Sequence, residues 1–203
     1  FEDPPQMSRR SLAWLLKDEN IPLATPAVLR NLSIAEKKKC VVIVQDAFTS
    51  HFEAPLVVDI ALLLRKLGFK PLVAPFKANG KPLHVHGFLH RFGKIARRQA
   101  DFLRALAEEN VSLVGVDPAM TLTFRSEYEH ALGKGVTPKV QLLQEWLMEH
   151  QEHLNRQKAL FKTDGIFRLM PHCTEKTNAP ASITAWQKVF AALGQKLEVV
   201  ATG

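Results

Sequence analysis

The stretch Cys40-Val41-Val42-Ile43-Val44 decides the fold of this chain. Four of its five residues are β-branched, and such an unbroken apolar run is typical of a strand covered on both faces, as in parallel sheets. Next along the chain, residues 55–67 predict an apolar-rich helix that Gly68 ends. Residues 70–74 predict a second strand, so this part of the sequence indicates a βαβ unit with a right-handed crossover.

Alternation of strands and helices continues on both sides of this unit. Further helices are predicted at 8–17, from Thr25, at 87–109, at 117–132, at 140–158 and at 180–193; those at 87–109 and 140–158 are amphipathic, and the inward side of the first includes Phe88. Further strands are predicted at 111–116, 166–170 and 196–201. The predicted connections are a polar turn at 46–51, a loop at 75–86 and a joint at 133–135. The pattern predicts an α/β protein, with a Rossmann-like parallel sheet and helices on both faces.

An internal repeat divides the chain. Ala54-Pro55 and Leu67-Gly68 bracket the helix of the first copy, and Ala179-Pro180 and Leu193-Gly194 bracket a helix of nearly equal length in the second. The first copy continues to Ala78-Asn79-Gly80, whereas the sequence stops soon after the last strand of the second. We therefore expect a helical lead-in at 1–39, a first repeat at 40–137, and a connecting helix with a truncated second repeat at 138–203.

Composition narrows the class of protein. The chain has 203 residues, is 46% hydrophobic and carries a formal net charge of +7. No apolar run approaches the ~20 residues of a membrane span. Two cysteines far apart, Cys40 and Cys173, suit a reducing compartment, so we expect a cytoplasmic location. The positive charge is spread along the chain, which favours a solvated surface over nucleic-acid binding.

Candidate chemistry lies where the predicted strands end. Ligands of doubly wound sheets bind beyond the carboxyl ends of the strands, and we expect the segments 46–47, 75–80, 117–118 and 172–173 along one edge of the sheet. Among these only His172 and Cys173 offer soft metal ligands. No glycine-rich phosphate loop follows the first strand, which argues against a dinucleotide site, and no catalytic triad is apparent.

Two histidine groups resemble metal-binding clusters: His84, His86 and His90, and His150 and His153 beside Glu149 and Glu152. The first group alternates in direction within a predicted loop and helix start. The second lies on one side of a predicted surface helix. Both patterns favour ordinary surface positions over a zinc site.

Three stretches carry a family resemblance. Val114-Gly115-Val116-Asp117-Pro118, with residues 122–128 downstream, resembles a family segment reading roughly "GLEPSCLLTLRDEY". Residues 80–89 resemble the segment after the family's cysteine pair, and residues 172–176 resemble its "HCHQK" motif. From about residue 41 onward the chain is similar to the cysteine-rich (CCG) domain of iron–sulfur oxidoreductases, most of all to the C-terminal part of large FAD-linked oxidases related to D-2-hydroxyglutarate and D-lactate dehydrogenases.

The departures from the family pattern concern the metal ligands. Ala47, Ala78-Asn79 and Met120 stand where the family has cysteines, and only Cys173 is kept. Alanine and asparagine cannot replace thiolates, and a cluster normally needs about four of them. The resemblance therefore implies a first repeat without metal and Cys173, with His172 as a weaker candidate, as an iron–sulfur or zinc ligand in a longer protein. The family's next cysteine pair would follow Gly203.

As a whole, the resemblance implies one domain of an enzyme that uses FAD and [4Fe–4S] clusters to oxidise a 2-hydroxyacid. Its partners would be flavin and ferredoxin-like domains upstream, and the enzyme would be cytoplasmic or peripheral at the inner membrane. The isolated chain would hold no cofactor and no catalytic residue. Two alternatives remain: an interaction module that has lost its cofactor, and a basic nucleic-acid binder, whose affinity would depend steeply on salt.

Overall fold

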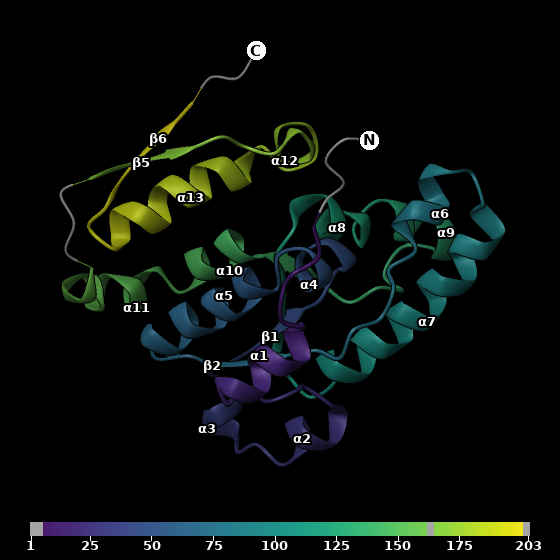
Figure 1. Ribbon diagram of the computed structural model, residues 1–203, viewed down its shortest axis with the longest axis horizontal. Coiled ribbons are helices and arrows are strands. Elements are labelled where there is room, and N and C mark those ends of the chain that lie inside the picture. Colours follow the sequence, from purple (N-terminus) through teal and green to yellow (C-terminus); the bar gives the residue numbers. More distant parts are fainter. Residues whose placement is uncertain (1–5, 162–164, 201–203) are drawn as a thin grey trace. The chain divides into compact units, whose positions relative to one another are not determined.

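The computed structural model describes residues 6–161 and 165–200 (Figure 1). The chain forms two compact units, Phe1–Val140 and Gln141–Gly203. The division into segments 1–39, 40–137 and 138–203 stays a prediction. None of the helices among the described residues has the length and apolar character needed to cross a membrane.

The first unit contains a parallel sheet and the helices around it. Its helices are α1 (Leu12–Asp18), α2 (Pro26–Arg30), α3 (Ile34–Lys37), α4 (Ala47–His51), α5 (Ala54–Lys66), α6 (Lys81–Val85), α7 (Leu89–Ala107), α8 (Pro118–Thr123) and α9 (Glu127–Leu132). Its strands are β1 (Cys40–Val44), β2 (Lys70–Val73) and β3 (Ser112–Gly115), and β4 (Val140–Leu142) starts at its last residue. The sheet order is β2-β1-β3-β4. Strand β1 pairs in parallel with β2 and with β3, which confirms the predicted α/β class.

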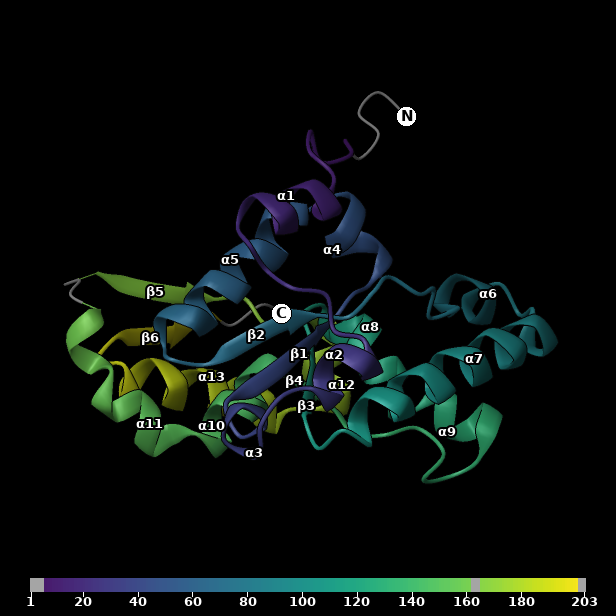
Figure 2. The same ribbon diagram turned by 90° about the horizontal axis from the view of Figure 1, so that it is seen from below.

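Strand β1 is buried on both faces, as its sequence predicts. Cys40, Val42 and Val44 pack in one cluster with apolar residues of α7. Val41 and Ile43 point to the opposite face because side chains alternate along a strand, and both are fully buried. Helices α1 and α5 lie on the other side of the sheet from α7 (Figure 2). The sheet is therefore covered from both sides.

The lead-in is tied to the edge of this sheet. Thr25 caps α2, because its hydroxyl oxygen accepts a hydrogen bond from the N–H of Val28 at 3.2 Å, and Pro26 follows as the first helical residue. The N–H of Ala24 donates to the carbonyl oxygen of Val73 at 2.8 Å. The predicted start of this helix is confirmed.

Several predicted boundaries in the first unit are wrong. The predicted turn at 46–51 is helix α4, the predicted loop at 75–86 contains α6, and the predicted helix at 117–132 is broken into α8 and α9. The break falls where the Arg125 guanidinium donates to the carbonyl oxygen of Val140 at 3.0 Å, a tertiary bond that sequence periodicity does not reveal. Phe88, expected to face inward, is 53% exposed.

The second unit begins within β4 and continues with further helices and two strands. These are α10 (Leu143–Glu149), α11 (Gln151–Arg156), the 3₁₀ turn η1 (Lys158–Leu160), β5 (Ile166–Leu169), α12 (Cys173–Asn178), α13 (Ala181–Ala192) and β6 (Lys196–Val199). The single helix predicted at 140–158 is wrong, because residues 140–142 are extended and join the sheet and the helix divides at His150. Ala201, the predicted end of the last strand, lies outside the described residues.

The two copies of the repeat share their topology and their strand register. Cys40 pairs with Lys70 in the first copy and Ile166 pairs with Lys196 in the second, so each position recurs 126 residues later. In both copies the residue after the helix-ending glycine donates its N–H to a carbonyl oxygen of the last helical turn. Phe69 donates to Leu64 at 3.0 Å, and Gln195 donates to Phe190 at 2.8 Å. However, β5 and β6 form a separate two-stranded sheet, so the expectation of one common sheet edge is wrong.

Candidate functional site

The residues after β1 are engaged in local hydrogen bonds. Asp46 is buried and caps α4: one carboxylate oxygen accepts from the N–H of Thr49 at 2.9 Å and the other from the Thr49 hydroxyl at 2.6 Å. The amide of Gln45 donates to the carbonyl oxygen of Ala74 at 2.8 Å and its oxygen accepts from the Ser50 hydroxyl at 2.8 Å. These polar groups join the ends of β1 and β2 and hold α4 in place.

Asn79 and Met120 meet at the carboxyl edge of this sheet. They come from the segments after β2 and β3, and the Asn79 amide nitrogen lies 3.2 Å from the Met120 sulfur. Both side chains are buried. The Asn79 side-chain oxygen accepts from the N–H of Lys81 at 3.0 Å, and its backbone carbonyl accepts from the Tyr128 hydroxyl at 2.7 Å. Two positions that the resemblance assigns to family cysteines are thus neighbours, filled by a packed and hydrogen-bonded pair.

Gly80 completes this corner of the first unit. Its φ of +78° is a left-handed conformation that glycine adopts without strain. An added Cβ would lie 3.1 Å from the Phe92 ring and 3.2 Å from a methyl carbon of Ile95. The left-handed turn therefore favours glycine here, and an added side chain would press on α7, independently of any metal.

A small cavity lies between the ends of β1 and β3. It has a volume of about 360 Å³ and is lined by Phe48, Thr49, Phe52, Glu53 and Asp117. The strand order reverses at this point, because β2 and β3 lie on opposite sides of β1, and such switch points commonly bind ligands. Here both charged side chains are carboxylates, and Asp117 already caps α8 through the N–H of Met120 at 2.7 Å. This lining would repel a pyrophosphate group.

In the second unit, His172 and Cys173 follow β5 after two intervening residues, Met170 and Pro171. The Nδ1 of His172 accepts a hydrogen bond from the N–H of Thr174 at 3.1 Å, so His172 caps α12. Cys173 is the first residue of that helix and is an exposed residue, and its sulfur lies 3.8 Å from the same Nδ1. Because Nδ1 is used by the cap, a metal bound to His172 would be held through Nε2.

A buried carboxylate fixes this corner of the second unit. Glu175 is 4% exposed. One of its oxygens accepts from the Gln144 amide at 2.7 Å and from the Ser182 hydroxyl at 2.9 Å, and the other accepts from the N–H of His172 at 3.3 Å. Sequence reasoning missed this role, although the spacing of His172 and Glu175 is that of a helix N-cap and its N3 partner.

The residues present do not fit an iron–sulfur cluster. The chain has two cysteines, and they lie in different units. Cys40 is at the amino end of β1, away from the carboxyl edge, and burial raises the pKa of its thiol to about 11. In residues 6–161 and 165–200, no three His, Cys, Asp or Glu side chains are grouped to hold a metal ion, and this includes both histidine groups singled out above. No chemical step is therefore assigned to a cluster within this chain.

The two thiols should differ sharply in reactivity. We expect Ellman's reagent to modify Cys173 readily in the native chain, because its sulfur is exposed, and to leave Cys40 unmodified at neutral pH, because its sulfur is buried and protonated. Absorbance of the released thiolate should correspond to one thiol per chain before and two after addition of denaturant. Two thiols in the native state would contradict the structure.

Fold and site together define a Rossmann-like α/β protein. In its first unit, packed side chains fill the carboxyl edge of the sheet, and in its second unit the segment after β5 carries one exposed cysteine. Comparison with known proteins gives a more specific relation. The chain is 49% identical over 201 residues to a D-2-hydroxyglutarate dehydrogenase of Pseudomonas putida, 41% over 207 residues to one of Haemophilus influenzae and 39% over 202 residues to one of Escherichia coli. Each comparison covers 99% of this chain but 20% of the relative, so the chain spans about a fifth of their length. No family model and no solved structure matches.

Proposed function

We propose that this chain is a domain of an FAD- and iron–sulfur-dependent 2-hydroxyacid dehydrogenase, placed at its C-terminus, where it serves electron transfer or domain docking. The observation that carries the proposal is the similarity of nearly the whole chain to three dehydrogenases named for D-2-hydroxyglutarate. The isolated chain would be colourless and inactive, since FAD and the clusters would be held chiefly by other domains of the same polypeptide. The enzyme would be cytoplasmic or peripheral at the inner membrane.

Within that enzyme, the residues of this chain would have two kinds of role. An iron–sulfur cluster completed by ligands from other segments of the enzyme would supply one-electron transfer. The exposed Cys173 sulfur would be one thiolate ligand of it, and the remaining ligands would come from outside the described residues. Glu175 and His172 would hold the first turn of α12 so that this sulfur stays exposed.

The test is made on the complete gene product. We expect it to contain flavin and to reduce an artificial electron-accepting dye with D-2-hydroxyglutarate, whereas the 203-residue chain does neither. A complete protein without flavin, or an active 203-residue chain, would contradict the proposal. A 203-residue chain that is brown, with a visible iron–sulfur absorption band, would contradict its cofactor-free state.

A second candidate is an interaction module that has lost its cofactor. It is favoured by the Asn79–Met120 contact, because two buried side chains that contact each other occupy positions where the resemblance would place thiolates.

Cys173→Ser in the complete protein separates the two candidates. A ligand role predicts that iron content falls and that dye reduction slows by about tenfold or more, since removing a ligand disrupts a cluster. An interaction role predicts no change in either. Thr174→Ser, at an adjacent position of α12, serves as the control.

A further inference from the structure

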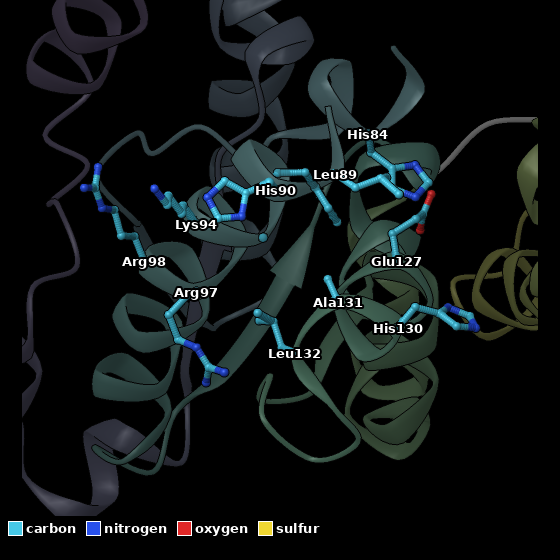
Figure 3. Close-up of a pocket in the computed structure, with 12 residues that line it drawn as sticks. His84, Leu89, His90, Lys94, Arg97, Arg98, Glu127, His130, Ala131 and Leu132 are labelled. Atoms are coloured by element: carbon cyan, nitrogen blue, oxygen red, sulfur yellow. The ribbon is translucent and has the colours of Figure 1, made fainter. Parts of the chain in front are cut away.

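A basic groove lies in the first unit, on the far side of Phe92 from the Gly80 corner described above. It has a volume of about 660 Å³ and is formed by α7, α9 and the end of α6 (Figure 3). Leu89 and Phe92 of α7 and Ala131 and Leu132 of α9 contribute its apolar lining. Its volume falls in the range of specific binding sites.

One wall of the groove carries uncompensated positive charge. Lys94, Arg97 and Arg98 project from α7, and none of them forms an ion pair or hydrogen bond through its side chain within the described part of the chain. Glu127, the carboxylate among the lining residues, is already bonded to Lys81 and Ser126. Like charges three and four residues apart on a helix repel one another, so this row weakens α7 without a compensating contact.

Gly93 directly precedes Lys94 and stands one helical turn before Arg97, in the interior of the 19-residue helix α7. A glycine there weakens a helix relative to alanine. An added Cβ would meet no atom within 4 Å, so packing within the chain does not require the glycine. Because glycine has no side chain, the backbone of α7 is uncovered at this point of the groove.

Exposed apolar side chains border the same groove. Val85, Phe88 and Leu89, at the corner between α6 and α7, are 69%, 53% and 61% exposed. Three large apolar side chains in such a short segment suggest an interaction surface more than a solvated corner.

We propose that this groove is the docking site of an acidic amphipathic helix from a partner protein. A helix laid along α7 would place carboxylates at i and i+3 or i+4 opposite Lys94, Arg97 and Arg98, and apolar side chains against Leu89 and its neighbours. The bare backbone at Gly93 allows close approach. Nucleic acid fits less well, because the exposed aliphatic side chains of Val85 and Leu89 have no counterpart on a phosphate backbone and cannot stack on bases.

The groove can be tested on the 203-residue chain, independently of the dehydrogenase proposal. The probe is a fluorescein-labelled helical peptide with glutamates along one face and leucines beside them, followed by fluorescence anisotropy. We expect binding that weakens as salt is raised, and that Arg97→Glu/Arg98→Glu reduces by about tenfold or more. The control is Lys38→Glu/Lys39→Glu, which makes the same change in net charge at exposed positions outside the groove and should bind as the unaltered chain does.

A second variant tests the groove without changing charge. Gly93→Gln fills the groove with a good helix former, so we expect the fold to remain, by circular dichroism, and peptide affinity to drop. The proposal is overturned if the peptide does not bind, if Gly93→Gln binds like the unaltered chain, or if both charge-reversal variants lose affinity equally. It is also overturned if duplex DNA binds at this groove and the peptide does not.

Discussion

Gly115→Ala is expected to destabilise the first unit by about 3 kcal/mol or more, a large share of the stability of an ordinary domain. Gly115 ends β3, and an added Cβ would overlap the Thr121 hydroxyl oxygen. Thr121 is 1% exposed and its hydroxyl donates to the carbonyl oxygen of Asp117 at 2.7 Å, so it cannot rotate away without breaking that bond. Helix α8 would have to move. Urea unfolding followed by circular dichroism measures the loss.

Two comparisons assign the effect to this contact. In the double variant Gly115→Ala/Thr121→Ala, the clashing oxygen is gone, so the combined cost should be clearly smaller than the sum of the two single costs. Gly93→Ala, in the open groove, should stabilise the chain by about 0.5–1 kcal/mol. Additive costs at positions 115 and 121 would show that the strand and helix are farther apart than the structure indicates.

Glu175→Ala should have the second large effect, in the second unit. Loss of the carboxylate leaves the buried Gln144 amide and Ser182 hydroxyl without their acceptor, and each such group costs about 1–3 kcal/mol. We therefore expect the free energy of unfolding of this unit to fall by about 3 kcal/mol, so that the unit unfolds at a lower urea concentration. The N–H of His172 loses its partner as well, so the start of α12 should loosen and hydrogen exchange there should accelerate.

Glu175→Gln is the matched control. Its side-chain oxygen can still accept from Gln144 and Ser182. Its cost should stay near or below about 1 kcal/mol. Equal losses for alanine and glutamine would indicate that the negative charge, rather than the hydrogen bonds, holds this corner together.

Where local signals agree with tertiary packing, the sequence predicts the fold well. The apolar run at 40–44, the Thr25-Pro26 helix start and the two Leu-Gly helix ends have the predicted roles. The errors have physical causes. Residues 140–142 fit the helical periodicity of residues 143–158, but they extend because the edge of β3 offers hydrogen bonds. Helix α4 was missed although Asp46 is a strong N-cap residue.

The candidate site was predictable in part. The ends of β1, β2 and β3 were correctly expected to be neighbours, because parallel strands end at the same edge of a sheet. The contact between Asn79 and Met120 depends on two irregular segments that no periodicity describes. The basic groove depends on α9 lying along α7, which requires the break at 124–126 that the sequence prediction did not include.

The equal register of the two copies has a consequence for how the chain folds. Strand β1 is wholly buried, whereas β5 is largely exposed, yet each pairs with its partner 30 residues later in the same alignment. Burial of the strands therefore does not determine the register in which they pair. The register is instead set by the crossover helix and the glycine that ends it. Their contacts are close in sequence, so they form early at low entropic cost. Each βαβ unit is thus expected to find its own pairing, as an autonomous step that precedes the assembly of any larger sheet.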